Sequence, residues 1–274
     1  MSKIEKALNK ARLSRQSLIS PKPERQREVA KESPLVKTIK YTKTKTIEVD
    51  PGVLTEKKVI ATPYVYAHAA EEYKLLKAQV LKKAREKGWQ TIMLTSVGKG
   101  EGKTLTAINL ALAISEEVNE TSLLVEADLR EPNMQRFFGF RGEPGLSDYL
   151  LECVALPDLL INIGIDRFVF LPGGQSIPNS AEILGSPKMQ SLVAEMRGCY
   201  ADRYVVFDLP PLLEFADALI FSEYVDAILL VVEANKTTTD HLKKAMELLE
   251  GKNIIGTVLN KVKTDEKQYY RYYR

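Results

Sequence analysis

The feature that most constrains the fold of this 274-residue sequence is an alternation of short apolar runs with helix-length segments. The helical segments include TLTAINLALAISEEV, TTDHLKKAMELLEG and HAAEEYKLLKAQVLKKAREKG, which ends at Gly88, and the apolar runs are TIMLTS, SLLVEAD, FVFLPG, YVVFDLP, AILLVVE and IIGTVLN. Apolar strands that alternate with helices form a mostly parallel sheet with helices on both faces. We therefore expect a single α/β domain over residues 62–262.

The two ends of the chain differ in composition from this central region. Residues 1–50 contain 13 Lys/Arg and 6 Asp/Glu, a charge of +7, whereas the remaining residues contain 26 and 30. We interpret residues 1–61 as a basic arm that begins with a short amphipathic helix and continues as a proline-containing linker. Three roles are open for it: a solvated tail, a helix that docks on a partner, and weak attraction to an anionic membrane face. Residues 263–274 form a tail rich in tyrosine.

Composition argues against several functional classes. Two histidines, and two cysteines without a CxxC spacing, predict neither a metal cluster nor thiol redox chemistry, and they fit a reducing cytoplasm. No apolar run approaches the roughly 18 residues of a membrane span, and no signal peptide opens the sequence. We expect a cytoplasmic protein that is recruited to the inner face of the membrane through a partner. Nucleic acid is not an expected partner, because the basic arm lacks interleaved aromatic residues.

A glycine-rich segment joins the first apolar run to the helix after it. VGKGEGKT lies between TIMLTS and TLTAINLA, which is the strand–loop–helix order of a phosphate-binding loop. Glycines let backbone N–H groups approach phosphate oxygens, and the helix N-terminus adds its positive dipole. The strict pattern G-x-x-x-x-G-K-[ST] fails at Val97, and a glycine-rich turn without nucleotide is the alternative. The residues expected to contact the nucleotide are Gly98, Lys99, Gly100, Glu101, Gly102, Lys103, Thr104 and Leu105.

Two side chains of this loop have expected roles in phosphate chemistry, and an acid on a later strand complements them. Lys103 is expected to bridge the β- and γ-phosphates, and the Thr104 hydroxyl to bind Mg²⁺. Asp208 ends the run YVVFD. An acid in this position typically holds Mg²⁺ directly or through water. Two prolines follow it, and they end the strand.

A second acidic motif ends another apolar run. LLVEADLREP places Glu126 and Asp128 two residues apart, with Arg130 just beyond. Arg130 is also expected to contact the nucleotide. Ligands of open α/β sheets bind outside the carboxyl ends of the strands, so both acids are candidates for holding Mg²⁺ and for activating water or a hydroxyl. The alternative is a helix cap or a salt bridge on a surface turn.

The last apolar run ends GTVLNKVK. We predict that the Asn260 amide reads the base edge of the nucleotide and that the Lys261 stem packs over the ring. An asparagine that only forms a turn is the alternative.

The sequence closes with QYYRYYR, which contains a third of the 12 tyrosines of the chain. Next to a phosphate-binding loop and two acidic motifs, these tyrosines are candidate phosphoryl acceptors. Each phosphate would add about −1.5 to −2 charge, and the accumulated repulsion would weaken self-association. The expected acceptors are Tyr269, Tyr270, Tyr272 and Tyr273.

TSVGKGEGKT, LLVEADLREP, YVVFDLPP and the tyrosine tail together resemble the bacterial tyrosine kinases, which are P-loop autokinases of capsule and exopolysaccharide assembly. The resemblance covers about residues 66–274 and includes GLSDYL, PGG and PNSAEILGSPKM. It implies the fold of the MinD and ParA ATPases, ATP and Mg²⁺ as cofactors, and transfer of phosphate to the tail of a neighbouring subunit. It also implies a homo-oligomer, a membrane polysaccharide co-polymerase as activator, a cognate tyrosine phosphatase, and control of polysaccharide polymerisation and export.

The resemblance assigns roles to individual residues. It implies that Lys103, Glu126, Asp128 and Asp208 are catalytic and that Thr104, Asp128 and Asp208 bind the metal. It also implies that Glu126 or Asp128 accepts the proton of the acceptor tyrosine. The second motif of the family has two aspartates, and Glu126 stands at the first position, so a slower kinase is expected. In the family, the helix that packs subunits into rings carries an acid, two arginines and an asparagine. Here two lysines stand in place of the arginines, and lysine lacks the planar guanidinium of arginine. The corresponding residues here are Glu71, Lys74, Lys77 and Gln79.

Two other functions fit parts of the same pattern. One is a nucleotide-switched positioning ATPase of the MinD/ParA kind, whose additional loop lysine would fall at position 98. This chain has Gly98 there, and the tyrosine tail has no purpose in such a protein. The other is a non-catalytic ATP-binding adaptor of polysaccharide export, with Glu126 marking the loss of transfer chemistry.

Overall fold

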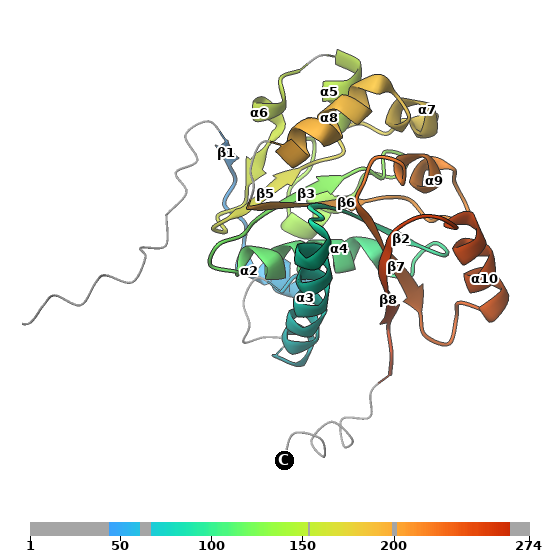
Figure 1. The fold of residues 1–274 in the computed structure, drawn as a ribbon. Coiled ribbons are helices and arrows are strands. Elements are labelled where there is room, and N and C mark those ends of the chain that lie inside the picture. The colour runs from blue at the N-terminus through green and yellow to red at the C-terminus, as the bar shows by residue number, and fades with distance from the viewer. Residues whose placement is uncertain (1–43, 61–66, 153, 199–201, 264–274) are drawn as a thin grey trace, which may run out of the picture. The chain divides into compact units, whose positions relative to one another are not determined.

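The sheet of the computed structural model has eight strands in the order β1-β4-β5-β3-β6-β2-β7-β8 (Figure 1). The structure describes residues 44–60, 67–152, 154–198 and 202–263. Within these residues every strand pair is parallel except β4 with β5. The prediction of a mostly parallel sheet is therefore confirmed. The strands are β1 (Lys45–Thr46), β2 (Thr91–Ser96), β3 (Thr121–Glu126), β4 (Ile161–Asn162), β5 (Phe168–Leu171), β6 (Arg203–Asp208), β7 (Ala227–Glu233) and β8 (Ile254–Asn260).

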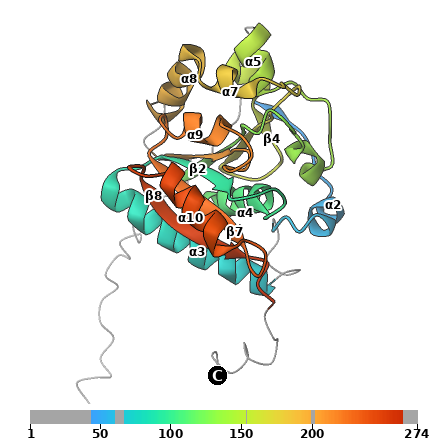
Figure 2. The same ribbon diagram turned by 90° about the vertical axis from the view of Figure 1, so that its right-hand side faces the viewer.

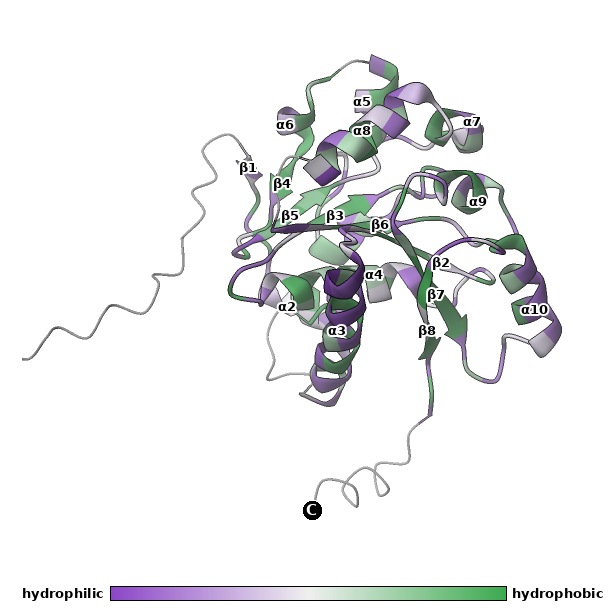
Figure 3. Cartoon of the chain, in the orientation of Figure 1, coloured by the Kyte–Doolittle hydropathy of each residue, from purple (hydrophilic) through white to green (hydrophobic). Residues whose placement is uncertain are grey.

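Helices cover both faces of the sheet, as Figures 1 and 2 show. The helices α2–α4 and the 3₁₀ helix η1 pack on one face, and α5–α10 pack on the other. Apolar residues are concentrated along the strands between these two layers (Figure 3). The helices are α2 (Pro51–Glu56), α3 (Ala67–Lys87), α4 (Lys103–Ser115), η1 (Met134–Phe138), α5 (Leu146–Glu152), α6 (Leu156–Leu159), α7 (Ser180–Leu184), α8 (Pro187–Gly198), α9 (Asp217–Phe221) and α10 (Thr239–Leu248).

Strand β2 shows why the central runs are apolar throughout and do not alternate with polar residues. Met93 points into the cluster under α5–α10, whereas Ile92 and Leu94 point into the cluster under α2–α4. A central parallel strand is buried on both faces, so polar alternation is lost. This pattern allowed the six predicted strands to be located, and each of them is present in the structure.

The register of the central strands brings the predicted acidic motifs together. In the pairing of β3 with β6, Glu126 lies opposite Asp208, and Leu94 of β2 lies on the other side of Asp208. The carboxyl ends of β2, β3 and β6 therefore adjoin at one edge of the sheet. Ligands of such sheets bind at this edge.

The folded region begins earlier than the predicted boundary at residue 62. Residues 45–60 form β1 and α2, β1 pairs with β4, and Leu54 and Val59 are buried in the core. The Asn109 side chain of α4 accepts a hydrogen bond from Ile60 N (2.9 Å) and donates one to Lys58 O (3.2 Å). Part of the predicted arm thus belongs to the domain. Two-residue strands such as β1 and β4 have no sequence periodicity, so the sequence did not predict them.

The C-terminal end of α3 matches the prediction. Gly88, with a φ of +69°, follows the last residue of α3, where a left-handed residue commonly ends a helix.

Within the described ranges no helix has the length and apolar character needed to cross a membrane. The predicted amphipathic helix at the N-terminus and the tail tyrosines lie outside the described residues.

Candidate nucleotide-binding and catalytic site

The glycine-rich loop leaves β2 and enters α4 through two residues in the left-handed conformation. Gly100 has a φ of +79° and Gly102, the N-cap of α4, has a φ of +93°. A Cβ at Gly102 would lie 2.2 Å from the Asn260 amide nitrogen, so only glycine fits. The first N–H groups of α4 have no partner within the helix and face the loop, which makes this end of α4 an anion site.

Side chains from β8 and from the segments after β7 and β8 donate hydrogen bonds to the carbonyls of this loop. Asn260 donates to Glu101 O (2.8 Å), Lys261 donates to Gly100 O (2.6 Å), and Lys236 donates to Lys99 O (3.2 Å). Both lysines also pair with Glu233, at 3.0 and 3.1 Å. The hydrogen bond from Lys261 is the main reason why the pKa of Glu233 is lowered. The structure therefore places Asn260 and Lys261 on the loop backbone, where they position it.

Three other predicted loop residues have partners within the protein. Glu101 is buried, and its carboxylate accepts hydrogen bonds from Val97 N (2.9 Å) and the Thr237 hydroxyl (2.5 Å). Lys99 is 63% exposed and pairs with Glu131 at 2.5 Å. Leu105 packs against the apolar cluster under α4.

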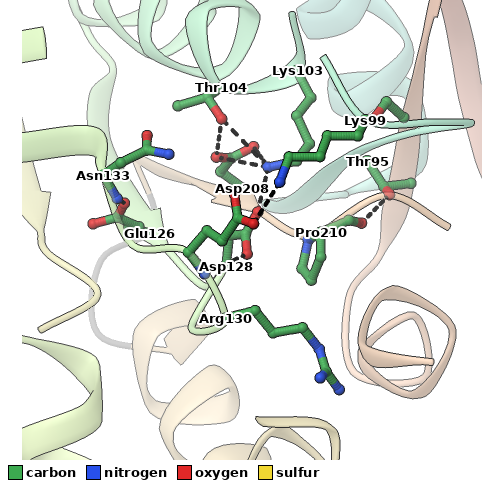
Figure 4. Close-up of polar contacts among 12 residues, drawn as sticks. Thr95, Lys99, Lys103, Thr104, Glu126, Asp128, Arg130, Asn133, Asp208 and Pro210 are labelled. Atoms are coloured by element: carbon green, nitrogen blue, oxygen red, sulfur yellow. Dashed lines mark hydrogen bonds and ion pairs between the residues drawn. The ribbon is translucent and has the colours of Figure 1, made fainter. Parts of the chain in front are cut away.

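Lys103 lies between two aspartates at the carboxyl edge of the sheet (Figure 4). Its ammonium is 2.8 Å from Asp128 Oδ2 and 3.4 Å from both carboxylate oxygens of Asp208. The Thr104 hydroxyl donates to Asp208 Oδ2 at 2.7 Å. The structure thus brings together four of the predicted site residues, which come from α4, β6 and the loop after β3.

Burial and charge act in opposite directions in this cluster. Desolvation lowers the pKa of Lys103, but Asp208 and Asp128 outweigh it, so the net shift is upward and Lys103 stays charged. Desolvation raises the pKa of Asp208, with Lys103 opposing it. Asp128 is more accessible, with 14% of its side chain exposed against 2% for Asp208.

The donor set of this cluster fits Mg²⁺. A hydroxyl and two carboxylates are hard oxygen ligands, and Mg²⁺ commonly takes one or two carboxylates and completes its shell with water and substrate phosphates. Among the described residues, no group of three or more His, Cys, Asp and Glu side chains could hold a metal by itself. Thr104, Asp128 and Asp208 would therefore hold Mg²⁺ together with a bound nucleotide.

Glu126 lies next to this cluster but has different partners. Its Oε1 accepts hydrogen bonds from Asn133 N and Met134 N, each at 2.6 Å, and its Oε2 accepts one from Gly173 N at 2.8 Å. Desolvation raises the pKa of Glu126 to about 7 even though these three N–H groups favour the charged form. Both oxygens are occupied by backbone groups, which corrects the expectation that Glu126 faces the acceptor tyrosine or the metal.

Arg130 also departs from its predicted role. Its guanidinium pairs with the buried Asp217 at 2.9 Å, donates to Pro178 O at 2.7 Å and lies 4.5 Å over the Phe215 ring. Figure 4 shows this side chain pointing away from Lys103. Arg130 therefore fastens the loop after β3 to the segment before α9 rather than contacting the nucleotide phosphates.

The residues predicted to pack subunits lie on α3. Glu71 and Lys74 form an exposed ion pair with each other at 2.7 Å, and Gln79 is exposed. Lys77 is mostly buried and pairs with Glu117 of the same chain at 2.7 Å. Three of the four predicted residues are therefore accessible to a neighbouring subunit, whereas Lys77 is committed to an internal contact.

Sequence reasoning missed several residues that shape the site. Lys236, Glu233 and Thr237 lie in the segment that follows the buried part of β7, and no periodicity or motif distinguishes them there. Asn133 and Gly173 act through their backbone N–H groups, which a sequence pattern does not identify. The PGG turn was a signal for Gly173, since paired glycines mark close backbone approach.

Comparisons with known proteins agree with this geometry. Residues 92–274 match the CbiA family, described as the CobQ/CobB/MinD/ParA nucleotide binding domain. The tyrosine-protein kinase YwqD of Bacillus subtilis (strain 168) is 30% identical over 224 residues, which are 81% of this chain and 93% of that protein.

Two solved structures are similar to this chain over most of its length. The kinase domain of the Escherichia coli tyrosine kinase ETK has a TM-score of 0.66 at 25% identity, covering 83% of this chain and 93% of that one. The chimerical protein CapA2B2 has a TM-score of 0.67 at 26% identity, covering 80% and 94%. With a nucleotide-binding loop, two acids around its lysine and these relatives, the chain belongs to the bacterial tyrosine-protein kinases within the CobQ/CobB/MinD/ParA nucleotide-binding family.

Proposed function

We propose that the chain binds ATP with Mg²⁺ and transfers the γ-phosphoryl group to tyrosines of its own C-terminal tail. The observation that supports this most directly is the position of Lys103, which lies between Asp128 and Asp208 at the end of the phosphate-binding loop. Bound Mg²⁺ would neutralise phosphate charge. Lys103 and the loop N–H groups stabilise the negative charge that develops on the transferred group.

The proton of the acceptor is assigned to Asp128. A tyrosine hydroxyl has an unperturbed pKa of about 10 and needs a base to react at neutral pH. Asp128 is the more exposed acid of the cluster. The tyrosine oxygen forms a bond to the γ-phosphorus, the bond to the bridging oxygen breaks, the electron pair leaves with ADP, and the phenol proton passes to Asp128.

The acceptor is proposed to come from a neighbouring subunit. Lys261 contacts Gly100 of the loop, and the described chain ends two residues later, at residue 263. Transfer between subunits rests on the resemblance to the bacterial tyrosine kinases. The accessible residues of α3 are the proposed subunit contacts. Phosphates added to the tail repel one another and weaken this association.

The proposed setting is the control of capsule or exopolysaccharide polymerisation and export. A membrane polysaccharide co-polymerase would recruit the protein to the inner face of the membrane and activate it, and a tyrosine phosphatase would reverse the reaction. This setting rests on the motif resemblance.

Incubation of the pure protein with Mg-ATP tests the proposal. We expect phosphate on Tyr269, Tyr270, Tyr272 or Tyr273 by mass spectrometry of tail peptides, no phosphate when EDTA removes Mg²⁺, and at least a ~100-fold slower reaction in Lys103→Ala. ATP hydrolysis without tail phosphate would instead support a nucleotide-switched ATPase. Nucleotide binding with neither activity would support a non-catalytic adaptor.

Mixing two inactive forms tests transfer between subunits. Lys103→Ala keeps its tail but lacks the phosphate-binding lysine, whereas a variant with all four tail tyrosines changed to phenylalanine keeps the site but lacks acceptors. Phosphate should appear on the Lys103→Ala tail only when both forms are present. If the parent protein phosphorylates its tail but the mixture of the two variants shows no tail phosphate, transfer occurs within one chain.

A further inference from the structure

We propose that Glu126 is a positioning residue. It joins two backbone segments, here called walls, which are the start of η1 and the turn after β5, around the loop of residues 127–133. Asp128 alone accepts the proton. The inference rests on the proposed kinase function. This loop runs from the end of β3 to η1 and contains Asp128. Its position decides where the Asp128 carboxylate lies relative to Lys103.

The first wall is the start of η1. Glu126 Oε1 accepts hydrogen bonds from Asn133 N and Met134 N, both at 2.6 Å. The residue that precedes the loop therefore binds the residues that end it. This contact closes the loop at its base, much as a side-chain cap closes the first turn of a helix.

The second wall is the turn after β5. Glu126 Oε2 accepts from Gly173 N at 2.8 Å. The segment that follows this turn holds the middle of the loop, since Ile177 N donates to Leu129 O (2.7 Å) and the Ser176 hydroxyl donates to Arg130 O (2.6 Å). One carboxylate thus fixes both the end of the loop and the segment that supports its middle.

The length of the side chain is matched to these contacts. A Cβ at Gly173 would lie 3.2 Å from Cγ and Cδ of Glu126, so the turn packs directly on the glutamate stem. An aspartate would end about 1.5 Å short of the same donors. Contacts of 2.6–2.8 Å would then exceed 3.5 Å, which is too long for a hydrogen bond.

The same contacts leave Glu126 poorly placed for proton transfer. The residue is 2% exposed, its Oε1 already accepts two backbone hydrogen bonds and its Oε2 accepts one. A general base needs an oxygen within hydrogen-bond reach of the proton that it removes. Lys103 bonds to Asp128 and Asp208, and Asp128 is the accessible member of the cluster.

Three variants separate a positioning role from a base role. Glu126→Gln keeps an acceptor oxygen for Asn133 N and Met134 N and loses only the bond to Gly173, whereas Glu126→Asp keeps the charge but not the reach. Asp128→Asn is the control that removes the proposed base. The measurements are kcat and KM for tail phosphorylation and hydrogen exchange at Met134 and Gly173 N–H.

We expect Glu126→Gln to keep kcat within about tenfold of the parent, because it leaves Asp128 in place. Glu126→Asp should lower kcat more than Glu126→Gln does and should expose both N–H groups to exchange. Asp128→Asn should remove activity while both N–H groups stay protected. If Glu126→Asp fails to fold, the kcat of Glu126→Gln still separates a positioning role from a base role.

Two results would overturn the proposal: Glu126→Gln as inactive as Asp128→Asn, or Glu126→Asp as active as the parent with unchanged exchange. If the parent itself leaves its tail unphosphorylated, the kinase proposal fails separately. The exchange measurements would still show whether Glu126 holds the two walls, and unchanged protection in both Glu126 variants would refute that.

Discussion

Lys103 and Glu126 are both buried ionisable residues, and their partners distinguish them. Lys103 has two carboxylates around it, so its charged form is favoured despite desolvation. Glu126 has only backbone N–H groups, and burial raises its pKa to about 7. A partner with a full charge outweighs burial in the first case, whereas backbone dipoles fail to do so in the second.

The raised pKa of Glu126 has a consequence for stability. Unfolded Glu126 loses its proton near 4.5 and folded Glu126 near 7, so the folded state holds the extra proton between these values and stability falls as the pH rises. Relative to Glu126→Gln, the parent should lose about 3 kcal/mol of unfolding free energy between pH 4.5 and 7.

Urea unfolding of both proteins at intervals from pH 4.5 to 8 measures this difference. The difference should level off above pH 7, where Glu126 has lost its proton in both states. A constant difference across the whole range would mean that Glu126 does not titrate in this window.

At the scale of secondary structure elements, the phosphate-binding loop is held by residues at the ends of β7, which pairs with β2, and of β8, which pairs with β7. Asn260, which ends β8, donates to a loop carbonyl, as do Lys236 and Lys261, and Glu233, which ends β7, pairs with both lysines. A peptide whose carbonyl is held outward directs its N–H inward. The carboxyl ends of β7 and β8 thus help to form the anion site of the loop.

Gly102→Ala tests whether the loop tolerates a side chain next to Asn260. The substitution places a Cβ 2.2 Å from Asn260 Nδ2 and forces a non-glycine residue to a φ of +93°, so ATP binding should weaken by at least ~100-fold. The double variant Gly102→Ala/Asn260→Ala removes the clash but keeps the backbone strain.

The double variant should therefore recover part of the affinity, and a double-mutant cycle by calorimetry with ATP measures the coupling. Asn260→Ala alone is the control. Additive effects of the two substitutions would show that the Asn260 side chain does not lie against Gly102.

At the scale of the whole domain, residues 44–60 complete the sheet and core at the β1 edge. β1 pairs with β4, α2 lies against η1, and a Cβ at Gly139 would lie 3.1 Å from the Val53 side chain. Leu54 and Val59 are buried. The domain therefore includes residues that the sequence analysis assigned to the arm.

Two truncated chains test this boundary. A chain of residues 62–274 exposes the surface that Leu54 and Val59 cover, at about 1.5–3 kcal/mol for each buried side chain. Its unfolding free energy should fall by at least about 3 kcal/mol relative to a chain of residues 44–274. Equal denaturant midpoints for the two chains would show that residues 44–61 do not stabilise the domain.

The central strands and the acid–lysine cluster were predictable because their signals are local. Six buried apolar runs fixed the strands, and Lys103, Thr104, Asp128 and Asp208 each follow a recognisable motif. Asn260 and Lys261 were predicted to contact the nucleotide base, whereas the structure shows them bonded to loop carbonyls, because side-chain direction is not encoded in the motif. Arg130 and Glu126 were misassigned because their partners, Asp217 and Gly173, lie far away in the sequence.

The sequence by itself determined the parallel sheet, the phosphate-binding loop, the two acids that face Lys103 and the kinship with tyrosine kinases. Each of these follows from residues that are neighbours in the chain or from the alternation of apolar runs with helix-length segments. The tertiary structure decided which charged groups share the site. Whether a carboxylate meets an ammonium or a backbone N–H depends on contacts between distant segments, and it is these contacts that separate Glu126 from Asp128.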